Sequence, residues 1–141
     1  MKKTVSLLLS VLLMLAFLGC LAACGGGKAD PWESAIYTAD TELGDGAKTL
    51  TLEVKALDKR VTLTVHTDKS TVGAALMEQG LLEGEDGPYG LYVKRVNGML
   101  ADYDKDQYYW AFYVGGEYAM AGVDSTEIDE SAVYQLAYTK G

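Results

Sequence analysis

The sequence predicts an α+β domain, a mainly antiparallel sheet with one packed helix. The pattern suits a β-grasp-like fold, although other small α+β folds share it. Three observations support this class. Apolar and polar residues alternate along several segments of residues 49–141, as in half-buried strands. Residues 70–80 instead have helical spacing and signals for both helix ends. Turn residues, such as Gly115-Gly116, separate the strand segments.

Residues 1–23 predict a lipoprotein signal peptide. They hold a positive start, an apolar run and small residues directly before a cysteine: Lys2-Lys3, residues 5–18, Ala22-Ala23 and then Cys24. The ending Leu-Ala-Ala-Cys resembles the lipobox of bacterial lipoproteins, in which the cysteine is diacylated and begins the mature chain. We therefore expect lipidation of Cys24, with Cys20 as the poorer acceptor. An uncleaved transmembrane helix is the alternative interpretation.

Cleavage before Cys24 would leave an acidic chain with a single cysteine. It leaves 118 residues and, because Lys2 and Lys3 are lost, takes the formal net charge from −8 to −10. That length suffices for one small core. Strong acidity argues against nucleic acid as a partner and against electrostatic attachment to anionic lipid. We expect the acyl chains to hold the protein on the extracellular face of the cell membrane.

Residues 24–48 predict a flexible linker that follows the lipidated cysteine. Gly25-Gly26-Gly27 and Gly44-Asp45-Gly46 are flexible or turn-forming, and no apolar period crosses the segment. Its apolar residues of note are Trp32, Ile36 and Tyr37. They dock on the domain or lie in a solvated linker, and the composition favours the linker. The folded domain would then comprise residues 49–141.

The domain opens with a predicted hairpin and helix. Residues 50–56 and 61–66 alternate in polarity around a turn at Asp58-Lys59. The helix has Ser70 as its expected N-cap and Gly80 as its stop. Its inward stripe is Val72, Ala75 and Leu76.

Further strands follow the helix. Residues 83–90 predict a loop, and residues 91–96 predict a strand that ends at Asn97-Gly98. Residues 107–114 form the densest apolar segment, which turns at Gly115-Gly116 and returns over 117–121. Residues 133–139 complete the predicted sheet.

The sequence gives little support to catalysis or metal binding. His66 is the single histidine and stands on the outward register of its strand, without a nucleophile–base set. Asp102, Asp104 and Asp106 have the spacing that opens a calcium loop, but the positions that need glycine and glutamate hold other residues. We therefore expect a protein that is not an enzyme, has no resident cofactor or metal, and carries a solvated acidic turn at 102–106.

Tyrosines concentrate in the second half of the chain, where nine of the ten lie between residues 89 and 138. Tyrosine keeps a polar tip that needs water or a partner. The strand 107–114 has two aromatic faces: Tyr108, Trp110, Phe112 and Val114 on one, Tyr109, Ala111 and Tyr113 on the other. A small core covers one of them. The other row binds a ligand or partner, or it rims a thin sheet for solubility.

We assign the Trp110 face to the core, because its residues are the more apolar. Tyr109 and Tyr113 are then the expected ligand-facing pair, with Tyr118 across the turn. A register shift of one residue would exchange the faces, so Trp110 stays an alternative binding residue.

Several segments together resemble the transcobalamin-like C-terminal domain of bacterial surface lipoproteins. They are residues 67–76, Leu91-Tyr92-Val93, Val96-Asn97-Gly98, residues 109–119, Gly122-Val123 and residues 134–138. The resemblance covers residues 49–141. It implies a β-grasp-like fold akin to the cobalamin-contacting β-domain of animal transcobalamin and intrinsic factor. It also implies a Gram-positive cell surface, with cobalamin or another corrinoid as the ligand to test.

Two functions remain in view. The first is a lipid-anchored cell-surface module that binds a ligand, such as a corrinoid, without catalysis. The second is a surface interaction or adhesion module that contacts a protein or glycan through its tyrosine-rich sheet face.

Replacement of Cys24 tests the anchor. Cys24→Ala should abolish labelling by palmitate and release the protein or leave an unprocessed precursor, because stable anchoring needs the acyl chains. Cys20→Ala should label like the wild type. Labelling that persists in Cys24→Ala and disappears in Cys20→Ala would make Cys20 the lipidated residue.

Overall fold

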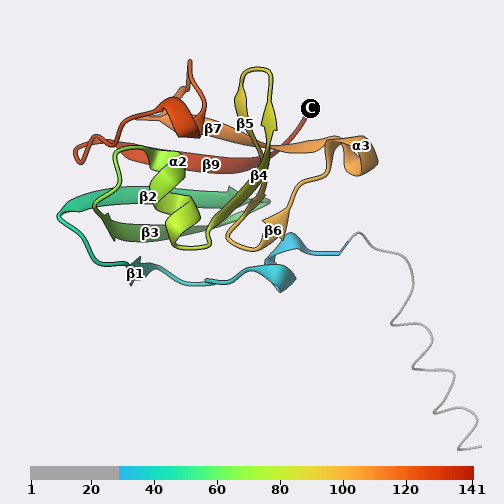
Figure 1. The fold of residues 1–141 in the computed structure, drawn as a ribbon. Helices are drawn as coiled ribbons and strands as arrows, with labels where there is room; N and C mark the ends of the chain where they lie inside the picture. Colours follow the sequence, from blue (N-terminus) through green and yellow to red (C-terminus); the bar gives the residue numbers. More distant parts are fainter. Residues whose placement is uncertain (1–28) are drawn as a thin grey trace, which may run out of the picture. The chain divides into compact units, whose positions relative to one another are not determined.

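Two β-sheets and a short helix build the domain (Figure 1). The structure is a computed structural model that describes residues 29–141, so the signal peptide and Cys24 lie outside the described residues. The larger sheet has the strand order β1-β3-β2-β9-β7-β8, and the smaller sheet has the order β4-β5-β6. The predicted α+β class is thereby confirmed. Within residues 29–141, no helix has the length and apolarity needed to cross a membrane.

The strands have the following bounds: β1 Thr41–Leu43, β2 Lys48–Ala56, β3 Lys59–Thr67, β4 Leu82–Gly87, β5 Gly90–Val96, β6 Met99–Leu100, β7 Tyr108–Val114, β8 Glu117–Tyr118 and β9 Val133–Lys140. The helices are α2 Val72–Glu78 and α3 Tyr103–Asp106, with 3-10 turns η2 Pro31–Ser34 and η3 Val123–Ser125. Where the sequence predicts a solvated acidic turn, residues 103–106 form the short helix α3, which has no buried residue.

The pairing is mainly antiparallel, as predicted, but the larger sheet also contains two parallel pairs. β2 pairs with β3 and β7 pairs with β9 in antiparallel register, but β1 runs parallel to β3 and β9 runs parallel to β2. Parallel neighbours need a long crossover connection. Here the helix and the smaller sheet lie between β2 and β9 in the chain. Alternation of polarity indicates which face of a strand is buried. It does not indicate which strand, far away in the chain, lies beside it.

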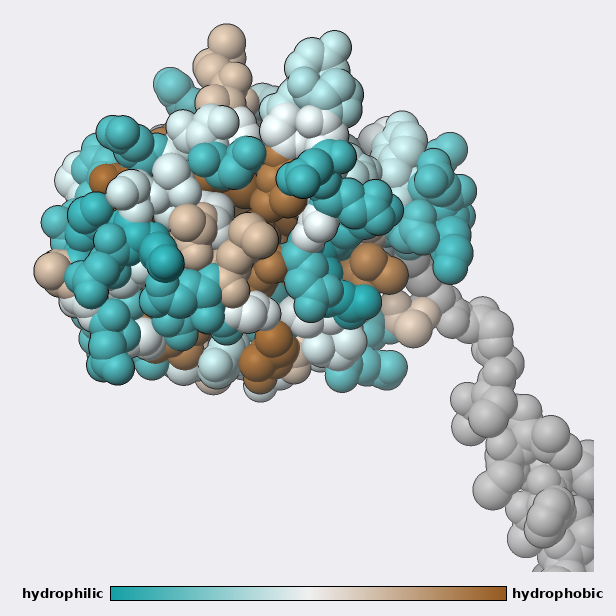
Figure 2. All heavy atoms as spheres, viewed as in Figure 1, coloured by the Kyte–Doolittle hydropathy of each residue, from teal (hydrophilic) through white to brown (hydrophobic). Residues whose placement is uncertain are grey.

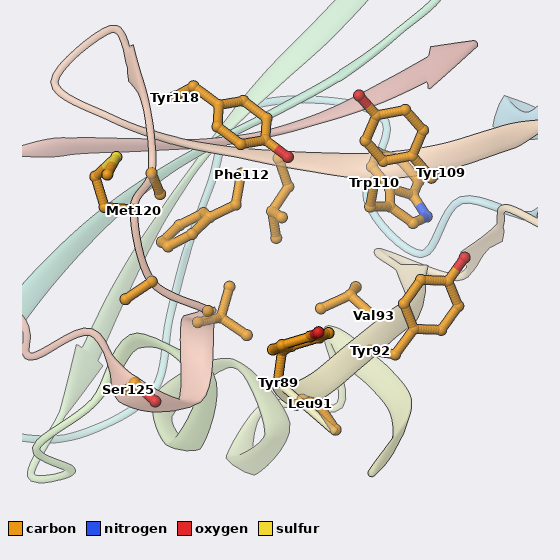
Figure 3. A pocket seen from close by; sticks show the side chains of 15 residues that line it. Tyr89, Leu91, Tyr92, Val93, Tyr109, Trp110, Phe112, Tyr118, Met120 and Ser125 are labelled. Atoms are coloured by element: carbon orange, nitrogen blue, oxygen red, sulfur yellow. The ribbon is translucent and has the colours of Figure 1, made fainter. Parts of the chain in front are cut away.

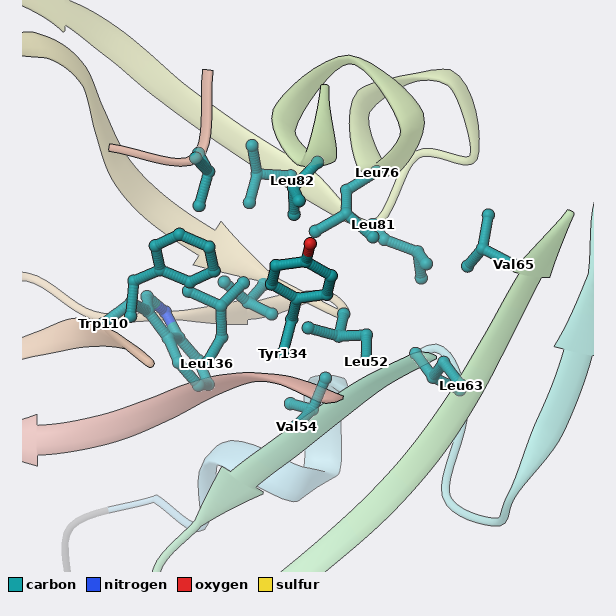
Figure 4. Close-up of a cluster of buried hydrophobic side chains, with 14 of the residues drawn as sticks. Leu52, Val54, Leu63, Val65, Leu76, Leu81, Leu82, Trp110, Tyr134 and Leu136 are labelled. Atoms are coloured by element: carbon teal, nitrogen blue, oxygen red, sulfur yellow. The ribbon is translucent and has the colours of Figure 1, made fainter. Parts of the chain in front are cut away.

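The core lies between the larger sheet and a cover made of α2 and the smaller sheet (Figure 4). Leu52, Leu63 and Leu136 point into it from the larger sheet, and Leu76 meets them from α2. Tyr134 is also fully buried, and its hydroxyl accepts the Asp129 N–H at 2.7 Å. A buried tyrosine is tolerated because its polar tip has a partner.

Helix α2 follows the prediction except at its first turn. Val72, Ala75 and Leu76 are buried, and Gly80 ends the helix with a φ of +69°. The N-cap, however, is Thr71, whose Oγ1 accepts the Ala74 N–H at 3.2 Å. The prediction of Ser70 is therefore wrong by one residue, since either hydroxyl satisfies the local preference for a cap.

The N-terminal segment belongs to the domain, which begins at Pro31. Trp32 is 7% exposed, and its Nε1–H donates to the Ala56 carbonyl at 2.9 Å. Tyr37 packs against the core, and β1 adds to the sheet beside β3. The prediction of a flexible linker is thus wrong for residues 31–48, and residues 24–28 lie outside the described residues. The segment docks on the domain because Trp32 buries a large apolar area and its indole N–H has a backbone acceptor.

A strand also replaces the loop predicted over residues 83–90. β4 pairs with β5 in antiparallel register up to the Gly87–Gly90 turn. Most β4 side chains are exposed, so no alternation of polarity indicates a strand. Cross-strand ion pairs accompany the pairing: Glu85 with Lys94 at 3.2 Å and Glu83 with Arg95 at 3.3 Å.

The buried tryptophan of the N-terminal segment provides a test of this boundary. Trp32→Ala should lower the free energy of unfolding by about 3–5 kcal/mol, as other large-to-small core changes do. Ile36→Ala is the control, because Ile36 is 53% exposed and should cost within about 1 kcal/mol. Urea denaturation followed by circular dichroism measures both. If Trp32→Ala were as stable as the wild type, the segment would be a linker and not part of the folded domain.

Candidate functional site

A groove with a volume of about 570 Å³ opens between β5 on one side and β7 with the chain after β8 on the other (Figure 3). Figure 2 shows apolar side chains gathered in a hollow between two projections, the β4–β5 hairpin and the loop beyond β7. Aromatic rings dominate its lining: Tyr89, Tyr92, Tyr109, Trp110, Phe112 and Tyr118. None of the lining residues is charged.

The floor of the groove is part of the folded core. Trp110 is 6% exposed and donates its Nε1–H to the Met99 carbonyl at 3.2 Å. Its ring tilts against Tyr138 at a centroid distance of 5.5 Å. Phe112 stacks on Tyr134 at 6.1 Å. Because these rings already have partners below, a ligand meets a preorganised aromatic surface.

The rim carries large side chains that the fold leaves in solvent. Tyr89 is 97% exposed at the tip of the β4–β5 hairpin, and Met120 is fully exposed on the opposite wall. Tyr92 and Tyr118 are also exposed. Contiguous exposed apolar side chains on a soluble domain are typical of a binding surface.

Asp124 joins the two walls of the groove. Its Oδ2 accepts the Leu91 N–H of β5 at 3.2 Å. Gly90 adopts a φ of +105°, and a Cβ there would lie 3.0 Å from the Asp124 carboxylate. On the other side, a Cβ on Gly73 of α2 would lie 3.0 Å from the Asp124 backbone. The turn η3 is therefore held between α2 and β5, and this sets the width of the groove.

The main chain of Trp110 adds a polar edge to the floor. Gly115 donates to the Val133 carbonyl and Gly141 donates to the Gln107 carbonyl, so odd-numbered positions of β7 bond to β9. Because antiparallel bonding alternates, the N–H and C=O of Trp110 point to the opposite edge. β8 pairs there only with Tyr113 and Val114, and Ala119 continues to Phe112. The peptide groups of Trp110 thus lie beyond the end of β8.

Residues 69–140 match a domain family described as a domain of unknown function, DUF4430. The chain belongs to the DUF4430 family. No curated protein matches it. Among solved structures, the DUF4430 chain is similar to a Ruminococcus gnavus protein described as a candidate metal-binding protein, with 29% identity and a TM-score of 0.63 over 67% of this chain and 99% of that one.

The DUF4430 chain is also similar to haptocorrin, solved in complex with Cbi. The identity is 18% and the TM-score 0.53, over 66% of this chain and 25% of haptocorrin. At this identity the likeness shows the fold alone. The predicted resemblance to transcobalamin-like domains is confirmed at that level.

The structure of the DUF4430 domain brings three of the four proposed binding residues to the groove. Tyr109, Trp110 and Tyr118 line it, whereas Tyr113 does not. Tyr113 instead meets Tyr118 edge-on at a centroid distance of 5.6 Å. The two faces of β7 are as predicted, with Trp110 and Phe112 buried on the core side.

On the outer sheet face, burial raises the pKa of Tyr109, and the neighbouring Tyr118, Tyr113 and Tyr103 raise it further. Tyr109 thus interacts electrostatically with the other three, and we call these four tyrosines the outer tyrosine cluster. The hydroxyl of Tyr109 stays neutral to higher pH than an isolated phenol.

The sequence did not indicate three of the rim residues as binding residues: Tyr89, Tyr92 and Met120. They lie in or beside segments where alternation of polarity is weak. A large side chain next to turn residues, as in Gly87-Pro88-Tyr89-Gly90, is the signal that could have found Tyr89.

The remaining polar candidates lie elsewhere. His66 contacts the Glu42 carboxylate through Nε2, and its Nδ1 lies 3.4 Å from Thr49 Oγ1. Among residues 29–141, no three His, Cys, Asp or Glu side chains form a cluster that could hold a metal ion.

Three alanine variants of β7 test the assignment of its faces. Trp110→Ala should lower the free energy of unfolding by about 3–5 kcal/mol, because it removes a buried ring and leaves a cavity. Tyr109→Ala and Tyr113→Ala, on the outer face, should each cost about 1 kcal/mol or less. Chemical denaturation distinguishes them. A stable Trp110→Ala beside an unfolded Tyr113→Ala would reverse the two faces.

Proposed function

We propose that this protein is a lipid-anchored, non-catalytic binding module of the cell surface and that its groove holds a flat organic ligand. The observation that carries the proposal is the groove itself, which six aromatic rings line. Two of these rings, Trp110 and Phe112, are fixed by the core, whereas Tyr89 stands in solvent at 97% exposure. Concave, mainly apolar sites with a few polar groups are the common form of small-molecule sites.

A corrinoid is the ligand class we favour. Haptocorrin, which shares the fold, is solved in complex with Cbi, and the sequence resembles transcobalamin-like domains. A corrin is a flat macrocycle edged with amides. The aromatic floor suits its ring, and the peptide groups of Trp110 offer a donor and an acceptor for those amides. The open groove would cover one side of such a ligand, which leaves the other side to solvent or to a second protein.

The anchor is part of the proposal. Its support is the order of residues before Cys24, which predicts cleavage and diacylation. An extracellular binding module held by acyl chains would meet its ligand at the membrane surface without any contribution from the acidic domain to attachment.

A second function has an observation of its own. Tyr113 and Tyr118 meet edge-on, and together with Tyr109 and with Tyr103 of α3 they form the outer tyrosine cluster. Tyr103 and Tyr118 are exposed. Tyrosines with free polar tips suit contact with a glycan or a protein surface. Tyr113 separates the two functions, because it belongs to the cluster and does not line the groove.

A spectroscopic titration of residues 25–141 tests the groove. Cobinamide and cobalamin should change the tryptophan fluorescence and the corrin absorbance in a saturable manner. Tyr89→Ala and Met120→Ala should each weaken binding by about three- to tenfold without lowering Tm, because both side chains are exposed and contribute through the ligand alone.

Tyr113→Ala is the matched control and should bind as the wild type does. Absence of saturable binding at millimolar corrinoid would exclude that ligand class. Weakening by Tyr113→Ala and none by Tyr89→Ala would move the site to the outer tyrosine cluster. A glycan array with the same variants then tests the second function.

A further inference from the structure

The groove combines aromatic walls with an absence of positive charge. No Lys, Arg or His is among its lining residues. The faces of aromatic rings carry the negative part of a quadrupole and attract cations placed over them. Tyr89, Tyr92 and Tyr118 are among the rings that surround the groove (Figure 3).

A carboxylate stands next to the groove lining without being part of it, and we call it the wall carboxylate. Asp124 sits between Val123 and Ser125, which both line the groove. Its carboxylate accepts the Leu91 N–H, a neutral donor, at 3.2 Å. Within the described part of the chain, no Lys, Arg or His side chain forms an ion pair with it. Its full negative charge therefore contributes to the field in the groove.

The two cations that directly follow the lining residue Val93 on β5 are already engaged with acids. Lys94 on β5 pairs with Glu85 at 3.2 Å, and hydrogen bonding to that carboxylate raises the pKa of Lys94. Arg95 pairs with Glu83 at 3.3 Å and donates to the Gly98 carbonyl at 2.9 Å. Neither reaches the groove lining. The balance of charge around the site is therefore negative.

Two further acids stand on the strands that border the groove. Asp86 lies opposite Leu91 in the β4–β5 hairpin, and Glu117 lies on β8. Both are exposed, and among residues 29–141 neither forms an ion pair.

We propose that the groove selects flat ligands that carry positive charge and rejects anionic ligands of the same shape. The inference rests on the proposed function and adds the charge of the ligand to it. Exposed cation–π contacts favour binding by roughly two- to fivefold each. The wall carboxylate of Asp124 adds a salt-sensitive contribution, since charges in and near a groove are partly shielded by water.

Three tricyclic probes of one shape test the preference: N-methylacridinium, which is a cation, acridine, which is neutral at about pH 8, and acridine-9-carboxylate, which is an anion. Fluorescence titration of residues 25–141 should rank them cation, neutral, anion. The cation should bind at least about fivefold more tightly than acridine at low salt. High salt should reduce the affinity for the cation and leave that for acridine unchanged.

Asp124→Asn isolates the wall carboxylate, because asparagine keeps an acceptor for the Leu91 N–H and loses the charge. Asp124→Asn should lower the affinity for the cation by about threefold and leave the affinity for acridine unchanged. Asp45→Asn is the matched control: it removes the same charge from an exposed position in the N-terminal segment and should change neither. Tyr89→Leu should lower the affinity for the cation more than Tyr89→Phe does, since phenylalanine keeps the aromatic ring.

The outcomes separate the two proposals. Equal binding of the three probes, or tightest binding of the anion, would overturn the charge preference and leave a groove for flat ligands. Equal losses in Asp124→Asn and Asp45→Asn would overturn the role of the wall carboxylate. If none of the three binds, the charge preference fails, and the corrinoid titration decides whether the groove binds at all.

Discussion

One buried asparagine fastens three parts of this domain together. Asn97 is fully buried in the turn between β5 and β6. Its N–H donates to the Leu81 carbonyl after α2 at 2.8 Å, and its carbonyl accepts the Ile36 N–H at 2.9 Å. Its side-chain amide exchanges two further bonds with the Tyr37 backbone, at 3.0 and 2.9 Å. Every polar group is satisfied, so the burial costs little, whereas loss of the amide would strand buried partners.

The same turn positions the floor of the groove. Asn97 and Gly98 both have positive φ, of 51° and 81°, which closes a two-residue hairpin and places Met99 at the start of β6. The Met99 carbonyl then accepts the indole N–H of Trp110. The wall of the groove follows from the same strand, because β5 runs from the hairpin tip to this turn. The site therefore depends on a hydrogen-bond network that also holds the N-terminal segment.

The alternation of polar and apolar residues predicted those strands whose burial depends on their own sequence. Alternation identified β2, β3 and β7 with the buried face of each, because one face of each strand meets the core, and the sequence also located β9. It missed β4, whose side chains are mostly solvated and whose pairing depends on its neighbour. It also missed the docking of Trp32, which is decided by an acceptor 24 residues away. The groove itself was not predicted: the sequence assigned Trp110 and Phe112 to the core, whereas these residues form its floor. Its rim depends on the contact of Asp124 with β5, which no local pattern indicates.

The groove exists because β8 is short. β8 pairs with Tyr113 and Val114 and ends at Tyr118, after which the chain leaves the edge of β7. Paired strands lie about 4.8 Å apart, so a longer β8 would close over Trp110 and occupy this space. The segment after β8 does not pack onto β7, because Asp124 bonds it to β5. Gly73, which has no side chain, lets the same segment approach α2 closely. An interrupted strand and one carboxylate thus convert a sheet edge into a site whose floor belongs to the core.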